Sequence, residues 1–309
     1  MPSNSFHFHF GNVLYTKTTK EIQSQIDADK PAFLFGNQGP DILFYLKVFR
    51  GVNNALGTNV HKSFETQKLI EMSANYIKQN TYHSILPYIY GMLCHYALDK
   101  NFHPFVYFRE KDNPKFCDKN IERFYHVDFE SSLDFVCIEE YMGEKSQYYD
   151  STKHLSISKS TAQEIALFYE NVFAPIYDPS LKSNELIKCI RYMKMALKVF
   201  DDKNGRKLKL FNTLEKLIKL PGYPRAALRP THLRADANYM NREHQLYPKY
   251  RNMPDQMINL SVDEMFDNAI NDALILVSAL YNRINFDIPL DDALFAINFA
   301  GDIMINTPI

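Results

Sequence analysis

The segment GMLCHYALDKNFHPF (91–105) carries His95, Asp99 and His103 at four-residue intervals in an otherwise apolar stretch. In a helix, side chains four residues apart lie one turn apart on the same face. An aspartate buried there needs a partner, because removing an unpaired charge from water costs several kcal/mol. Imidazole and carboxylate groups are ordinary zinc ligands, so a metal ion would satisfy all three side chains. Histidines that only complete hydrogen bonds in the core are the alternative interpretation.

The residue before a proline is disfavoured in the helical region of dihedral space. Because Pro104 follows His103 directly, we expect the helix to end at His103. The imidazole of His103 would then turn off the end of the helix.

A second pair, His126 and Glu130, repeats the four-residue spacing on a segment that is otherwise lined by apolar residues. This pair could bind metal, or it could be a surface ion pair of little energetic consequence. Asp41 follows Gly39 and Pro40 at the start of ILFYL. A carboxylate is favourable at a helix N-terminus whether or not a metal is present, so an N-cap is the alternative for Asp41.

Histidines in two more segments extend the set. His61 is expected to open a helix after GTNV, and His7 and His9 lie in HFHFG, where a two-residue spacing cannot place both on one helical face. Eight potential ligands from five segments exceed the needs of one tetrahedral zinc ion and suit a polynuclear site, a type that typically hydrolyses phosphate esters. The candidate ligands are His7, Asp41, His61, His95, Asp99, His103, His126 and Glu130.

The elements that position these residues are predicted to be helices. Apolar residues recur at three- and four-residue intervals, alternating strand patterns are rare, and only 10 glycines are present for tight turns. Ser160 with Gln163 and Ser261 with Glu264 have the spacing of capping boxes. We therefore predict one all-α domain over residues 1–309, with the ligands within 1–140 and with helices and a long loop (221–254) in 141–309. The predicted helical segments include 61–80, 121–142, 162–177, 185–200, 208–220 and 262–284.

The bulk composition excludes several classes of protein. A formal net charge of −1 argues against a dedicated duplex-DNA binder, and no apolar run reaches the roughly 18 residues of a membrane span. The amino terminus lacks the charged and apolar regions of a secretory signal. Four cysteines without a CxxC pair indicate reduced thiols, so we expect a cytoplasmic protein.

The predicted loop 221–254 is long for a compact domain, and such loops are often functional. It could be a solvated surface loop, or a lid whose arginines meet an anionic substrate. The weak candidates for substrate binding are Arg234, Arg242 and His244.

The ordered series of His7, GNQGPD with Asp41, His61, GMLCHYALDKNFHP and His126/Glu130 resembles the zinc-dependent phospholipase C family. That family includes bacterial phosphatidylcholine-hydrolysing enzymes and clostridial alpha-toxin, and it is related to fungal zinc-dependent single-strand nucleases. The similarity covers residues 1 to about 140. It implies two or three zinc ions and a phosphodiester substrate, possibly a phospholipid headgroup.

The resemblance also implies a role for each ligand. His61, His95, Asp41 and Asp99 would hold one zinc ion, and His103, His126 and Glu130 a second. Asp99 would bridge the first ion to a third one, held also by His7. A water between the metals would attack phosphorus, with Asp41 as the general base.

The chain departs from the family at three points. It has no tryptophan, whereas family phospholipases use an amino-terminal tryptophan as a ligand of the third zinc ion. Either His7 recruits another partner such as His9, or the third site is weak or empty. Asp99 and His103 are closer in sequence than the corresponding pair of secreted members. Nothing after residue 150 resembles the membrane-docking β-sandwich of the toxins.

Two further functions stay open at this stage. A nuclease or nucleotide phosphoesterase would use the same metals, and a non-catalytic helical protein would use zinc only to hold its fold. The preference for histidine and carboxylate over cysteine favours a hydrolytic centre.

Overall fold

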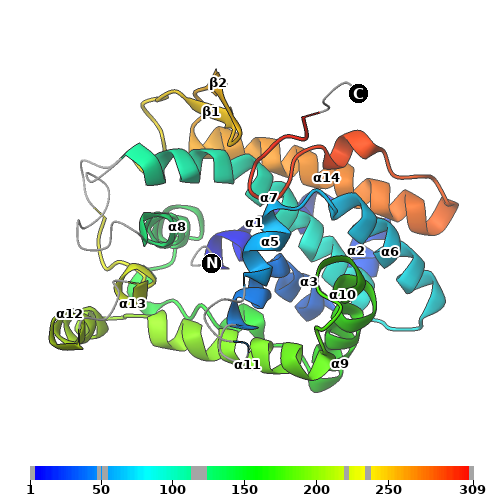
Figure 1. The fold of residues 1–309 in the computed structure, drawn as a ribbon, viewed down its shortest axis with the longest axis horizontal. Coiled ribbons are helices and arrows are strands. Elements are labelled where there is room, and N and C mark those ends of the chain that lie inside the picture. The colour runs from blue at the N-terminus through cyan, green and yellow to red at the C-terminus, as the bar shows by residue number, and fades with distance from the viewer. Residues whose placement is uncertain are drawn as a thin grey trace.

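Helices pack around one long central helix, α7 (Ile85–Asp112), in the computed structural model, which describes residues 4–46, 50, 55–112, 124–218, 223–233 and 238–305 (Figure 1). This helix contacts α1, α2, α3, α6, α8, α9 and α14. The prediction of an all-α fold is confirmed, since the described residues form only one sheet, of two strands. No helix among the described residues has the length and apolar character that crossing a membrane requires.

The chain order of the elements is as follows. The first part contains α1 (Asn4–Lys17), α2 (Lys20–Asp27), α3 (Lys30–Gly36), the 3-10 helix η1 (Gly39–Leu46), α5 (Leu56–Lys62), α6 (Thr66–Gln79) and α7. The middle part contains α8 (Tyr125–Val136), η3 (Cys137–Tyr141), η4 (Ser146–Tyr148), η5 (Lys153–Leu155), α9 (Lys159–Phe168), η6 (Tyr169–Phe173), α10 (Ala174–Tyr177) and α11 (Ser183–Phe200). The last part contains α12 (Arg206–Ile218), α13 (Tyr223–Ala226), β1 (Tyr247–Tyr250), β2 (Met253–Ile258), α14 (Val262–Phe286) and η7 (Asp292–Phe295).

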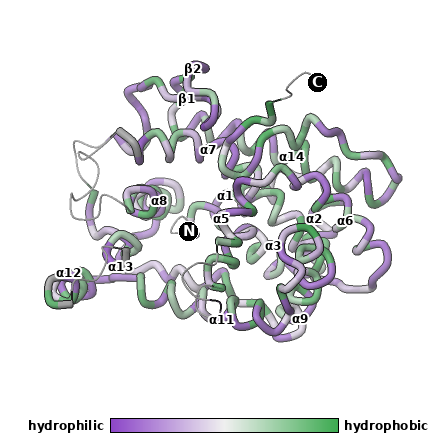
Figure 2. Tube along the Cα trace, viewed as in Figure 1, coloured by the Kyte–Doolittle hydropathy of each residue, from purple (hydrophilic) through white to green (hydrophobic). Residues whose placement is uncertain are grey.

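One large apolar core holds most of these helices together, and a smaller cluster around Tyr125 and Ala226 joins α8 to α13. The hydrophobic residues in Figure 2 concentrate on the central helices. The closest helix contact is between α3 and α7. A Cβ atom added to Gly91 would lie 2.2 Å from the carbonyl oxygen of Phe33, so only glycine permits this approach. The close contact brings the end of α3 beside His95.

The expectation that the helix ends at His103 is wrong, because α7 continues through Pro104 to Asp112. A proline inside a helix removes one hydrogen bond and costs about 3 kcal/mol. Phe102, Phe105 and Val106 are buried around it. Each such side chain stabilises the fold by about 1.5–3 kcal/mol when buried, which outweighs the lost bond. His103 therefore stays on the helix, one turn from Asp99.

Two predicted helix starts also need correction. His61 lies in the last turn of α5, not at the start of the next helix, because Ser63 has an extended backbone and α6 begins at Thr66. The N-cap of α9 is Ser158 rather than Ser160, since the Ser158 hydroxyl accepts a hydrogen bond from the Thr161 amide. The capping box at Ser261 and Glu264 is confirmed.

The predicted loop 221–254 instead contains the short helix α13 and runs into an antiparallel hairpin, β1–β2. Tyr247 pairs with Ile258 and Tyr250 with Met253, so Arg251 and Asn252 form the turn. Prolines at 248 and 254 hid these strands from sequence analysis, because proline is excluded from central strands. A two-stranded ribbon has only edge strands, and both prolines fit there.

The carboxy-terminal segment folds back against α7 at Gly301. This glycine has φ +76°, and a Cβ atom added to it would lie 2.6 Å from Cδ of Pro104. The Arg251 amide donates to the Gly301 carbonyl (2.8 Å), and the Ala300 amide donates to the His61 carbonyl (2.9 Å). The close approach at Gly301 thus ties the hairpin and the end of α5 to the same segment.

We predict that Gly301→Ala destabilises the protein more than Gly143→Ala does. Gly143 also has positive φ (+64°), but nothing lies within 4 Å of an added Cβ, so its substitution causes backbone strain alone, about 1–2 kcal/mol. Gly301→Ala adds a steric clash of about 1–3 kcal/mol. Urea unfolding of both variants measures the difference, and equal losses would show that the contact with Pro104 is unimportant.

Candidate metal centre

Four imidazole rings surround the buried carboxylate of Asp99. His7 Nε2 lies 3.3 Å from its Oδ1 atom. Three further rings face its Oδ2 atom: His95 Nε2 at 3.0 Å, His61 Nε2 at 3.4 Å and His103 Nδ1 at 3.7 Å. These histidines come from α1, α5 and α7, so three separate helices meet at this one side chain.

Backbone carbonyls orient three of these rings, and the carbonyl that bonds His103 is that of Phe299. His61 Nδ1 lies 2.7 Å from the Gly57 carbonyl oxygen, and His95 Nδ1 lies 3.0 Å from that of Asn37. A carbonyl oxygen can only accept, so each of these two Nδ1 atoms donates to it, and the Nε2 atom of the same ring faces the Asp99 carboxylate. Metal-binding histidines are oriented by such bonds from the second ring nitrogen.

A second group lies where α8 meets α7. Glu130 Oε1 is 3.2 Å from His126 Nε2 and 3.7 Å from His103 Nε2. The opposite nitrogens have their own partners, since His126 Nδ1 lies 3.3 Å from Glu110 and His103 Nδ1 hydrogen-bonds the Phe299 carbonyl. The Nε2 atoms of both rings therefore point to one carboxylate.

Asp41 completes the first group from η1. Its Oδ1 atom is 3.2 Å from His61 Nε2. Burial alone would raise the pKa of Asp41, but the hydrogen bond from His61 and the nearby imidazoles lower it below its ordinary value. Burial alone would likewise lower the pKa of His61, yet Asp41 and Asp99 raise it to about 10. The buried carboxylates therefore favour a positive charge at this point.

The other two carboxylates follow the same pattern. Burial alone would raise the pKa of Asp99, but His103 and His95 bring it well below its usual range. Burial opposes ionisation of Glu130 as well, and His126 and His103 lower its pKa. Both side chains are thus held as anions.

Asp134 anchors the helix that supplies His7. It lies one turn beyond Glu130 on α8, and its carboxylate accepts hydrogen bonds from the amides of Ser5 (3.2 Å) and Phe6 (2.9 Å) at the start of α1. Burial raises the pKa of Asp134 to about 7, despite these two bonds. The position of His7 thus depends on a carboxylate from a distant helix.

The donor atoms are arranged as a metal site requires. They form three groups, each with its ligand atoms within 4.8 Å of one another: His7, His95 and Asp99; Asp41, His61 and His95; and His103, His126 and Glu130. Nε2 of His95 and Oδ2 of Asp99 are buried without a hydrogen-bond partner among the described residues. A cavity of about 20 Å³, enough for one water-sized species, lies between His7, Asp99, His103 and Glu130. These residues fit zinc ions.

The structure thus brings together all eight predicted ligands, which we call the eight-residue cluster. The group of His103, His126 and Glu130 is the second ligand set that the resemblance implied. In the other two groups the shared residue is His95, and Asp99 groups with His7 and His95. His9 lies apart from the cluster, with its ring stacked on Tyr141 at 5.7 Å.

The three candidates for substrate binding are not part of this cluster. Arg234 lies outside the described residues. Arg242 is exposed and pairs with Glu140, and His244 is half exposed and bonds the Asn259 carbonyl at 2.9 Å. Their role in substrate binding stays a prediction.

Sequence analysis missed the residues that orient the ligands. No sequence signal points to the Phe299 carbonyl, which is 196 positions from His103 along the chain. Glu110 and Asp134 did carry a signal. They lie seven residues after His103 and four after Glu130, spacings that keep them on the same helix faces as these ligands.

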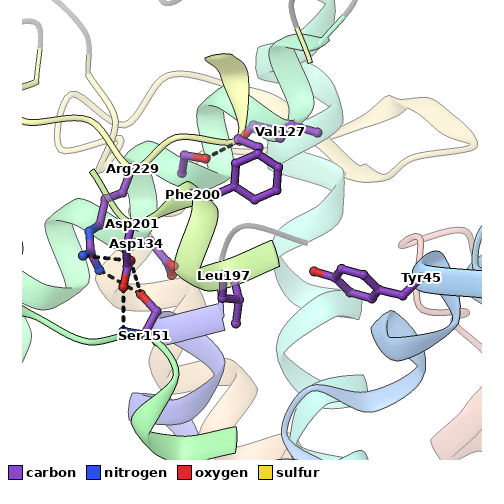
Figure 3. Close-up of a pocket in the computed structure, with 10 residues that line it drawn as sticks. Tyr45, Val127, Asp134, Ser151, Leu197, Phe200, Asp201 and Arg229 are labelled. Atoms are coloured by element: carbon purple, nitrogen blue, oxygen red, sulfur yellow. Dashed lines mark hydrogen bonds and ion pairs between the residues drawn. The ribbon is translucent and has the colours of Figure 1, made fainter. Parts of the chain in front are cut away.

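A second cavity, of about 30 Å³, is lined by residues that include members of η1, α8 and α11 (Figure 3). Tyr45 of η1 points toward Leu197 of α11 across it, and Val127 and Ser131 of α8 form another part of its wall. At its far end Arg229 donates to Ser151 Oγ (2.9 Å). Val127 and Ser131, which line this cavity, directly follow the candidate ligands His126 and Glu130 along α8.

Comparison with known families agrees with this geometry. A family model described as zinc-dependent phospholipase C matches residues 6–177. The match covers more than half of the 309 residues and includes the entire eight-residue cluster. The chain therefore belongs to the zinc-dependent phospholipase C family, which implies a phospholipid-type substrate. Comparisons with curated proteins and with solved structures found no match.

We predict that Asp134 makes stability depend on pH. Its folded-state pKa of about 7 lies above the ordinary 3.8, so between these values the folded protein retains a proton that the unfolded chain has released. The contribution of Asp134 to the free energy of unfolding therefore decreases as the pH rises between these two pKa values. From pH 5 to pH 8, the free energy of unfolding of the wild type should therefore fall by on the order of 2 kcal/mol relative to that of Asp134→Asn.

Chemical denaturation at several pH values measures this difference. Asp255→Asn, at an exposed position, is the matched control and should show no such pH dependence. A difference between wild type and Asp134→Asn that is constant across this range would contradict the assignment.

Proposed function

We propose that this protein is a zinc-dependent phosphodiester hydrolase that acts as a phospholipase C. The observation that carries the proposal is the convergence of the eight-residue cluster on buried Asp99, in a chain that belongs to this family. Two or three zinc ions would be held by the three groups of donors. When bound, zinc lowers the pKa of coordinated water and neutralises charge that develops on phosphoryl oxygens.

The protein's own residues have distinct tasks in this proposal. Asp99 belongs to one ligand group, and its carboxylate lies 3.0–3.7 Å from histidines of all three groups, so it would hold them together. Asp41 is buried and ionised beside His61, so its carboxylate can accept a proton from the attacking water. The carbonyls of Gly57 and Asn37 hold two imidazoles in the orientation that binding requires.

The overall reaction adds water across one phosphodiester bond. The hydroxyl group joins phosphorus, the bond from phosphorus to the glycerol oxygen breaks, and that oxygen takes up the remaining proton. Phosphatidylcholine would then yield diacylglycerol and a phosphorylated headgroup.

The donor chemistry favours catalysis over a purely structural zinc site. Structural sites are usually closed and rich in cysteine. The three cysteines that the structure describes, Cys94, Cys137 and Cys189, are buried, free and outside the cluster. Cys117 lies outside the described residues. These thiols are also the basis on which we still propose a cytoplasmic location.

We predict that the protein releases diacylglycerol from phosphatidylcholine in mixed micelles and that a zinc chelator abolishes this activity. Added zinc should restore it. Asp41→Asn removes a ligand and a proton acceptor, so kcat/KM should fall by at least about 100-fold. His9→Gln, two residues from His7 and outside the cluster, is the matched control and should retain wild-type activity.

The products separate the possible outcomes. Release of nucleotides from single-stranded nucleic acid, with no hydrolysis of phosphatidylcholine, would favour a nuclease. Zinc that binds tightly and stabilises the protein, without hydrolysis of either substrate, would favour a structural role. Activity that survives both chelation and Asp41→Asn would contradict the proposal.

A further inference from the structure

The helices α11 and α12 concentrate the positive charge of the chain. Residues 183–218 contain nine lysines and arginines against four aspartates and glutamates, whereas the whole chain contains 35 against 36. In a protein of net charge −1, this segment is positive by five, and the rest of the chain is negative. Helix α12 lies at the edge of the molecule, where it packs against α13 (Figure 1).

The acidic residues of this segment are all engaged within the protein. One caps the first turn of α12 through two backbone amides, and the other three pair with arginines. The contacts are Glu185–Arg50 (3.0 Å), Asp201–Arg229 (3.0 Å), Glu215–Arg225 (3.4 Å) and Asp202 with the amides of Lys207 (3.1 Å) and Leu208 (2.8 Å). Their negative charge is therefore largely neutralised before any partner approaches.

Most of the basic side chains, in contrast, have no such contacts. The following six form no ion pair or side-chain hydrogen bond with residues in the described parts of the chain: Arg191, Lys194, Lys198, Lys203, Arg206 and Lys209. Three of these, Lys198, Lys203 and Arg206, border an open cavity at the junction of the two helices. The rest of its lining is Lys207, Asp150, Asp201, Asp202 and Asn204. The surface thus presents a net positive charge to solvent, which Asp150 beside Lys198 and Lys203 offsets only in part.

Apolar side chains are exposed among these bases. Met195 and Val199 lie one turn apart on α11 and are 53% and 48% exposed. On α12, Leu210 and Leu217 are 55% and 73% exposed, with the half-buried Leu214 between them. Spacings of three and four residues place the three leucines on one helical stripe. Figure 2 shows hydrophobic and hydrophilic residues alternating around α12.

We infer that the α11–α12 surface, defined by the six basic residues and these exposed apolar side chains, docks the protein on anionic phospholipid membranes. Clusters of four to eight lysines and arginines on an amphipathic helix are attracted to acidic lipids. Exposed leucine and methionine can enter the boundary between headgroups and acyl chains. Nucleic acid would be attracted to the charge but offers no apolar layer for these side chains, so a membrane is the better match.

This inference rests on the proposed function, because it explains how a phospholipid substrate would reach the site. The inner face of α11 supplies Leu197 and Phe200 to the cavity in Figure 3. Tyr45 and Ser131, from the two elements that carry Asp41 and Glu130, line the same cavity. Helix α11 therefore carries part of the proposed membrane surface on one face and part of the wall of this cavity on the other.

Sedimentation with lipid vesicles tests the inference. The zinc-loaded protein should bind vesicles of phosphatidylcholine mixed with phosphatidylserine, bind pure phosphatidylcholine vesicles at least about tenfold more weakly, and dissociate at high salt. The variant K198E/K203E/K209E should bind the mixed vesicles at least about 100-fold more weakly. Leu210→Ser combined with Leu217→Ser should weaken binding at least about tenfold.

A matched control makes the same change in net charge by replacing three lysines outside the α11–α12 surface. Lys17, Lys20 and Lys159 are exposed on α1, α2 and α9, and K17E/K20E/K159E should keep wild-type affinity for the vesicles. Equal weakening by both triple variants would show a general effect of net charge and overturn the assigned surface. Absence of wild-type binding, or binding to single-stranded nucleic acid that is tighter than to mixed vesicles, would overturn it as well.

A short-chain, monomeric phosphatidylcholine separates docking from catalysis. The variant K198E/K203E/K209E should hydrolyse this soluble substrate at the wild-type rate and lose activity only on mixed vesicles. If the wild type hydrolyses it without binding vesicles, the docking surface is refuted and the proposed function stands. If it binds vesicles through this surface but hydrolyses neither form, the proposed function fails and docking stands.

Discussion

The structure depends on the burial of one carboxylate, Asp99, among four imidazole rings. An isolated anion in this place would destabilise the fold by several kcal/mol, so the surrounding helices must supply positive charge or a metal ion. That need explains why α1, α5 and α7 converge where they do. It also explains the raised pKa of His61, which lies between Asp99 and Asp41. The negative charge of these carboxylates strongly favours the binding of a cation at the centre.

Parts of the chain far from the ligands hold this arrangement. The carboxy-terminal segment lies beyond residues 6–177, yet the Phe299 carbonyl orients His103 and the Ala300 amide bonds the end of α5. Asp134 fixes the start of α1, and through it the position of His7. The second half of the chain thus completes the centre, although it supplies none of the predicted ligands.

The sequence was sufficient for the all-α class and for the set of candidate ligands, because both depend on local spacing. His95 with Asp99 and His126 with Glu130 are neighbours on any helix, whatever surrounds it. The sequence was insufficient to predict the structure where tertiary packing overrides a local preference. Pro104 argued for a helix end, but buried Phe105 and Val106 keep α7 intact. Pro248 and Pro254 hid the hairpin, and carbonyl partners such as Phe299 carry no side-chain signal at all.

The central claim, that Asp99 joins the ligand groups into one zinc centre, is tested most directly by the zinc content of the purified protein. Inductively coupled plasma mass spectrometry should find two or three zinc ions per chain in the wild type and at least one fewer in Asp99→Ala. Asp267→Ala, at an exposed position on α14, should retain the full content. A wild-type protein that contains no zinc after purification without chelator, and takes up none when zinc is added, would contradict the account.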